Sequence, residues 1–237
     1  NMSQNYQYYL GIYKNKEPFS YAPEVSVLQT CQNVYPEFFP AKFYTAPYKF
    51  ETLGNPQDFS REMAPPGHYG SDEIDFSTFY GEKDERLSIS MADDDIDLVP
   101  CNILLSWENI EDIPTIDRLE EIFKVLAKTF SADLGRVSNS NFAISNEIYD
   151  RVVDHNKYPK LMEWITWLHP AHTQNIGAEK IEALKDIVRV QPFMDGYLVT
   201  LTDEPYDDAI PEHRKIRIEV EGRLGLTAIY EANKAES

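Results

Sequence analysis

The aspartate-rich segment near the middle of the chain is the first candidate for chemistry. Asp93, Asp95 and Asp97 stand at the first, third and fifth positions of a calcium-binding loop of the EF-hand kind. Such a loop needs glycine at its sixth position and glutamate at its twelfth, but these positions hold Leu98 and Leu104. We therefore expect no metal here. Two interpretations stay open for the segment: a solvated turn, or a surface that contacts another protein.

Histidine, cysteine and lysine give no stronger candidate. His169 and His172 stand three apart, but Pro170 between them opposes the helix that a His-Glu-x-x-His zinc site needs. No lysine follows an acidic residue by two positions, as the Asp/Glu-x-Lys pair of restriction-type nucleases requires. The Gly-x-x-x-x-Gly-Lys loop and the Gly-x-Ser-x-Gly elbow are absent, and nothing around Cys31 or Cys101 indicates a cysteine–histidine pair. We expect no catalytic residue, no cofactor and no enzymatic activity.

A second acidic group directly follows an apolar, β-branched stretch. Its members are Asp203, Glu204, Tyr206, Asp207 and Asp208. Tyrosine is effective in protein interfaces because it brings a large contact area with few rotatable bonds. The group is either a solvated loop before a helix or an acidic contact loop with Tyr206 as its anchor.

Negative charge is concentrated in one part of the chain. Residues 58–117 hold 16 Asp and Glu against three Lys and Arg, so they contribute −13 of the formal net charge of −18. A concentrated acidic face is suited to a basic partner, such as a nucleic-acid-binding protein. DNA and RNA are not expected to bind directly, because phosphate binding needs Lys and Arg.

The composition indicates a globular chain. Of its 237 residues, 42% are hydrophobic and 13% aromatic, which is ample for a core, and we expect a single domain over 1–237. No run of 18 apolar residues is present, so we expect no membrane contact through a spanning helix. The first residues lack a basic segment followed by an apolar stretch, and two cysteines make no disulfide framework. We therefore expect a cytoplasmic protein with reduced thiols.

Strand and helix patterns are interleaved without a regular strand–helix–strand period, which predicts an α+β fold with a mostly antiparallel sheet and flanking helices. Strands are expected at 6–13, 87–91, 98–107, 164–168 and 196–202. Helices are expected at 27–35, 116–130 and 178–188 and after Pro211, with Thr115 as an N-cap and Gly135 as a C-terminal stop of the second helix. Six prolines and many aromatic residues predict an irregular layer at about 36–70.

Several segments resemble one bacterial family, the immunity protein 52 group. YLGIY at 9–13 resembles its opening strand, and WITWL at 164–168 its central Trp-x-Thr-aromatic-Leu segment. DGYLVTLTDEPYD at 195–207, followed by PEH at 211–213, resembles its C-terminal strand, acidic loop and helix start. Proteins of this group are paired with restriction-endonuclease-like toxins of polymorphic and type VI secretion systems.

The resemblance implies a non-enzymatic immunity protein that binds a cognate secreted DNase-type toxin and protects the producing bacterium. An acidic surface suits this role, because it would fit the basic DNA groove of a nuclease and speed association. The residues that we predict to contact the toxin are Asp93, Asp94, Asp95, Asp97, Asp203, Glu204, Tyr206, Asp207 and Asp208. The alternatives are a metal-dependent hydrolase using the clustered carboxylates, and an acidic adaptor that mimics DNA towards another basic protein.

Overall fold

The computed structural model describes residues 8–14, 23–37, 42–45, 49–52, 74–80, 85–92, 101–145, 159, 161–226 and 228. Contacts between residues group the chain into two compact units: unit 1, Asn1–Asp133, and unit 2, Leu134–Ser237. The single domain that the sequence predicts over 1–237 stays a prediction.

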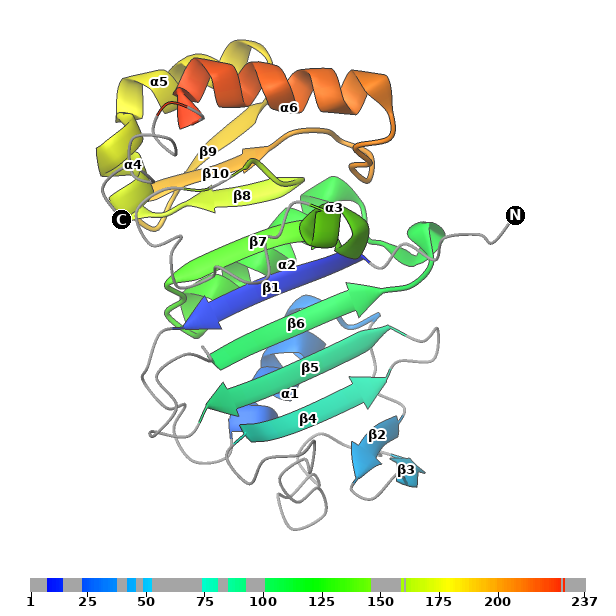
Figure 1. The fold of residues 1–237 in the computed structure, drawn as a ribbon. Helices are drawn as coiled ribbons and strands as arrows, with labels where there is room; N and C mark the ends of the chain where they lie inside the picture. Colours follow the sequence, from blue (N-terminus) through cyan, green and yellow to red (C-terminus); the bar gives the residue numbers. More distant parts are fainter. Residues whose placement is uncertain are drawn as a thin grey trace. The chain divides into compact units, whose positions relative to one another are not determined.

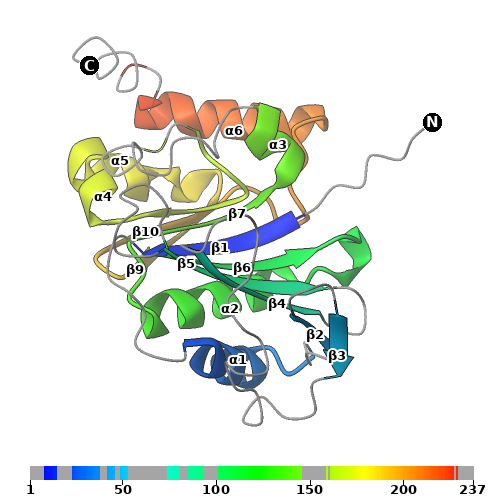
Figure 2. The same ribbon diagram turned by 60° about the horizontal axis from the view of Figure 1, so that its bottom comes forward.

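Unit 1 is a sheet with two helices. Its strands are β1 (Tyr8–Lys14), β2 (Lys42–Thr45), β3 (Lys49–Thr52), β4 (Ile74–Tyr80), β5 (Arg86–Ala92) and β6 (Cys101–Trp107). They lie in the order β3-β2-β4-β5-β6-β1, and every neighbouring pair in this series is antiparallel (Figure 1). The helices α1 (Pro23–Val34) and α2 (Ile116–Thr129) pack on each other on one side of these strands (Figure 2). A 3₁₀ turn, Ile110–Asp112, precedes α2.

Unit 2 has four strands and a layer of helices. Its strands are β7 (Leu134–Asn139), β8 (Ile165–Leu168), β9 (Arg189–Phe193) and β10 (Gly196–Thr200), in the antiparallel order β7-β8-β10-β9. Its helices are α3 (Ser140–Ser145), α4 (Pro170–Ile176), α5 (Ala178–Glu182), a 3₁₀ turn at Ala183–Asp186, and α6 (Pro211–Leu224). Among them α4, α5 and α6 lie together over the strands (Figure 2). The α+β fold class, with a mostly antiparallel sheet and flanking helices, is thus confirmed.

The strongest sequence patterns correspond to observed elements. The expected strands at 6–13, 87–91, 98–107, 164–168 and 196–202 match β1, β5, β6, β8 and β10. The apolar stripe at 116–130 is α2, whose Leu119, Ile122, Phe123 and Leu126 are fully buried because they recur on one helix face. Among the described residues, no helix is both long enough and apolar enough to cross a bilayer.

Two expected helix ends are wrong. Gly135 does not stop α2, because the helix ends at Thr129, Ser131 takes the left-handed conformation (φ 48°), and Gly135 already lies in β7. The helix expected at 178–188 is divided: α5 ends at Glu182, and a 3₁₀ turn follows at Ala183–Asp186, which the Ile187 N–H closes by donating to the Leu184 carbonyl. Most of segment 36–70 lies outside the described residues, and its described strands β2 and β3 have four residues each.

Cys31 is a free, buried thiol in α1. Burial raises the pKa of this thiol to about 12, which keeps it protonated and unreactive at neutral pH. The expectation of a reduced, buried thiol is confirmed for Cys31, while the side chain of Cys101 lies outside the described part of the chain.

Two glycines of unit 2 provide a matched stability test. A Cβ at Gly196 would lie 2.1 Å from the Leu168 carbonyl oxygen, whereas a Cβ at Gly222, which is exposed in α6, would meet nothing within 4 Å. We expect Gly196→Ala to lower the free energy of unfolding by about 2 kcal/mol or more, because the backbone must shift. Gly222→Ala should raise it by about 0.5–1 kcal/mol. Urea denaturation of both variants measures this, and equal effects would contradict the close approach at Gly196.

Candidate functional site

The acidic loop, residues 203–210, connects β10 to α6 and begins at a firmly held point. The Leu201 N–H donates to the Trp164 carbonyl, and the Trp164 indole N–H donates to the Thr202 carbonyl, both at 2.9 Å. The Thr202 hydroxyl then donates to the Glu204 carbonyl at 2.7 Å and forms a local turn. The loop therefore leaves the sheet in one fixed direction.

Tyr206 is the apolar support of this loop and lies inside unit 2, with 1% of its surface exposed. Its ring packs edge-on against Phe142 at 5.8 Å and stacks on His213 at 5.6 Å. The Asn139 side-chain amide donates to the Tyr206 carbonyl at 3.0 Å. The ring fills the space between α3 and α6 because most of its area is apolar. Tyr206 thus supports the loop from inside, and its role as the anchor of a toxin contact stays a prediction.

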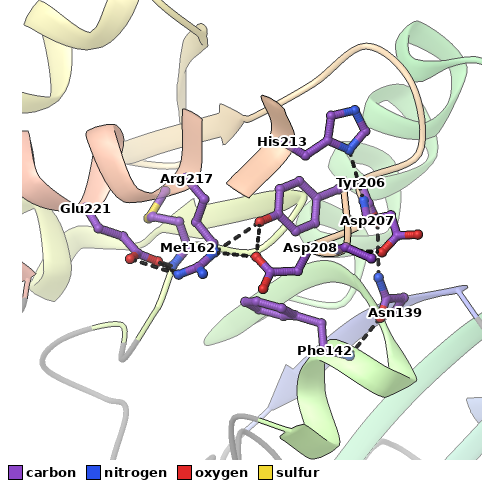
Figure 3. A network of polar contacts seen from close by, with 10 residues as sticks. Asn139, Phe142, Met162, Tyr206, Asp207, Asp208, His213, Arg217 and Glu221 are labelled. Atoms are coloured by element: carbon purple, nitrogen blue, oxygen red, sulfur yellow. Dashed lines mark hydrogen bonds and ion pairs between the residues drawn. The ribbon is translucent and has the colours of Figure 1, made fainter. Parts of the chain in front are cut away.

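Arg217 of α6 is the centre of the polar network beneath the loop (Figure 3). Its Nε lies 3.0 Å from both the Tyr206 hydroxyl and the Asp208 carboxylate, and the Tyr206 hydroxyl donates to the same carboxylate at 2.6 Å. Its Nη1 donates to both carboxylate oxygens of Glu221, at 2.9 and 3.0 Å. The guanidinium thus holds the loop and α6 together through two carboxylates.

The Arg217 side chain is mostly buried and packs against an aromatic ring. Phe142 lies against the guanidinium, with 5.3 Å between its ring centre and Cζ, and the Arg217 side chain is 10% exposed. Burial alone would lower the pKa of Arg217, but the carboxylate of Glu221 and the groups of Tyr206 and Asp208 hold this pKa above its ordinary value. Burial and the hydrogen bond with Asp208 raise the pKa of Tyr206. Arg217 therefore stays charged and Tyr206 stays neutral.

His213 closes the loop from the first turn of α6. The Asp207 backbone N–H donates to Nδ1 of His213 at 3.0 Å, so Nδ1 is the acceptor and Nε2 carries the hydrogen. Nε2 lies 3.2 Å from the Glu204 carboxylate and donates to it. This hydrogen bond lowers the pKa of Glu204 below its ordinary value and keeps the carboxylate ionised.

The carboxylates of the loop have two different roles. The Asp208 carboxylate accepts a hydrogen bond from Arg217 inside the network. The Asp207 carboxylate accepts the Ala209 N–H at 2.9 Å. The side chains of Asp203 and Glu204 are 76% and 68% exposed, and Arg189 of β9 lies 3.6 Å from Asp203. Among the predicted contact residues of this loop, Asp203 and Glu204 are therefore the ones with side chains that are mostly exposed to solvent.

The other predicted contact residues, Asp93, Asp94, Asp95 and Asp97, lie outside the described residues, so their role stays a prediction. Within the part of the chain that the structure describes, no group of three or more His, Cys, Asp and Glu side chains is placed to hold a metal ion.

The expectation that Pro170 opposes a helix is wrong. Pro170 is the first residue of α4, where a missing N–H costs nothing, and His169 caps the helix by accepting the His172 N–H at 3.4 Å. The two imidazole rings stack at 3.6 Å, and Trp167 packs edge-on against His169. Both histidines are buried parts of unit 2.

His213, Arg217 and Glu221 were not among the predicted site residues. They recur every four residues, so they lie on one face of α6, together with the buried Val220 and Leu224. A polar series at this spacing beside apolar residues is the sequence signal that indicates a buried polar network on a helix.

The network predicts a large loss of stability for Arg217→Met. The change would leave Asp208 and Glu221 without their shared counter-ion, so we expect the free energy of unfolding to fall by about 3 kcal/mol. The matched control is Arg223→Met, since Arg223 also joins two carboxylates, those of Asp186 and Glu219, but is 38% exposed. This control should cost at most about 1 kcal/mol. Similar small losses in both variants, measured by chemical denaturation, would contradict the central role of Arg217.

The chain matches no protein-family model and no curated protein. Among solved structures it is similar to a protein named "Pseudomonas aeruginosa T6SS protein PA0821", with a TM-score of 0.60 and 12% sequence identity. The similarity covers 93% of this chain and 75% of that protein. At this identity the likeness shows a shared fold.

Proposed function

We propose that this chain is a cytoplasmic immunity protein that binds and neutralises a cognate nuclease toxin of a type VI secretion system. The observation that carries the proposal is the shared fold with a Pseudomonas aeruginosa protein named for that system, over 93% of this chain. The sequence segments that resemble the immunity protein 52 group support the finer assignment to that group.

The charge of the chain supports a basic protein as the partner. The formal net charge is −18, and the acidic loop presents Asp203 and Glu204 to solvent. Acidic surfaces attract proteins with basic grooves and raise the rate of encounter, which matters when a toxin must be captured before it cuts DNA.

The rigidity of the loop supports tight binding. Tyr206, Arg217 and His213 fix the loop backbone from below, so that little conformational entropy is lost when Asp203 and Glu204 meet a partner. A preformed acidic surface can inhibit a toxin by covering the toxin's own binding surface. This mode of inhibition protects the cell without any catalytic group in the immunity protein.

Co-expression tests this proposal. A nuclease-toxin gene found next to the gene of this chain would be induced in a susceptible bacterium with and without the chain, followed by affinity purification of the pair. We expect growth to be restored and the two proteins to purify together. Absence of both rescue and complex would contradict the immunity function.

Association kinetics test the acidic surfaces separately. The double variant Asp203→Asn/Glu204→Gln and the quadruple variant with Asn at Asp93, Asp94, Asp95 and Asp97 should each bind the toxin about tenfold more slowly at low salt, because charge steering is lost. Both should also show a weaker salt dependence. The control Glu111→Gln/Glu179→Gln removes two exposed carboxylates elsewhere. Unchanged association for one variant would remove that acidic segment from the interface.

A further inference from the structure

The turn between β9 and β10 consists of two residues in the left-handed conformation. Met194 has a φ of 45° and Asp195 a φ of 58°, and Phe193 pairs with Gly196 to close the hairpin. Positive φ at both central residues characterises a type I′ turn, which strongly prefers Asn-Gly. Aspartate tolerates this conformation moderately, but methionine is a steric outlier, because its Cβ approaches the following carbonyl oxygen.

Contacts with β8 hold this turn in place. The Trp167 indole N–H donates to the Phe193 carbonyl at 3.3 Å, and the rings of Trp167 and Phe193 pack edge-on at 5.9 Å. On the other strand, Gly196 lies so close to the Leu168 carbonyl that no side chain fits there. The hairpin therefore keeps Met194 and Asp195 in their unfavourable conformation.

The fold itself does not require these two side chains. Asp195 is exposed and Met194 is half-exposed, and within the described residues neither side chain has a hydrogen bond or an ion pair. Asn-Gly would form the same turn without steric strain. Strained backbone positions that the fold does not need cluster at ligand-binding and other functional sites.

We propose that the Met194–Asp195 turn is a contact point for the toxin, an inference that rests on the proposed function. Methionine is flexible and fills irregular apolar notches on protein surfaces. The Asp195 carboxylate next to it pairs with a lysine or arginine at the rim of such a notch, and it repels nucleic acid phosphates and anionic lipids. The partner surface is therefore an apolar notch bordered by basic side chains, as a DNA-binding protein provides.

The double variant Met194→Asn/Asp195→Gly tests this inference, because it gives the turn its preferred sequence. We expect the melting temperature of the free chain to rise by about 2–4 °C, since the strain is removed. We also expect the complex with the purified product of the adjacent toxin gene to dissociate at least about tenfold faster. The control Glu179→Gln removes one exposed charge of unit 2 and should change neither value.

A higher melting temperature together with faster dissociation supports the inference, because a loss of folding cannot explain weaker binding by a more stable protein. Unchanged dissociation of the variant overturns it, even where the wild-type chain binds the toxin tightly. A melting temperature that does not rise overturns the premise of strain. If the wild-type chain does not bind the toxin at all, the proposed function is overturned instead. The toxin is then not the partner of this turn.

Discussion

The acidic loop of unit 2 depends on one buried guanidinium. Arg217 binds Glu221 on its own helix and Asp208 in the loop, while Tyr206 shares the hydrogen bonds on the loop side. A buried arginine needs such partners, because an unpaired charge away from water is very unfavourable. The same requirement favours one position of the loop, because moving Asp208 away would leave Arg217 with Glu221 as its remaining carboxylate partner in this network.

The carboxylates in and around the acidic loop fall into two groups. Asp208 and Glu221 act within the fold, whereas Asp203 and Glu204 face solvent, one near Arg189 and the other held by His213. A loop supported in this way presents negative charge in one geometry, which favours a defined protein partner over diffuse counter-ion binding.

The sequence predicts the elements with strong hydrophobic periodicity, such as β1, α2 and β10. It does not predict β7 or β9, because Gly135 and Pro192 oppose strands locally. These strands form through pairing with β8 and β10, and Pro192 is accommodated in β9, which within the described residues of unit 2 pairs only with β10. In the site, the position of the acidic loop before a helix could be predicted. The burial of Tyr206 could not, because its contacts with Phe142 and Asn139 join residues more than 60 positions apart.

Carboxyl-group footprinting tests the proposal that the acidic loop binds a toxin. Exposed carboxylates are labelled with a carbodiimide and an amine, in the free chain and in its complex with the toxin, and the labels are located by mass spectrometry. We expect Asp203 and Glu204 to react in the free chain and to be protected in the complex, while Glu179 reacts in both. Equal labelling of Asp203 and Glu204 in the free and bound chain would contradict it.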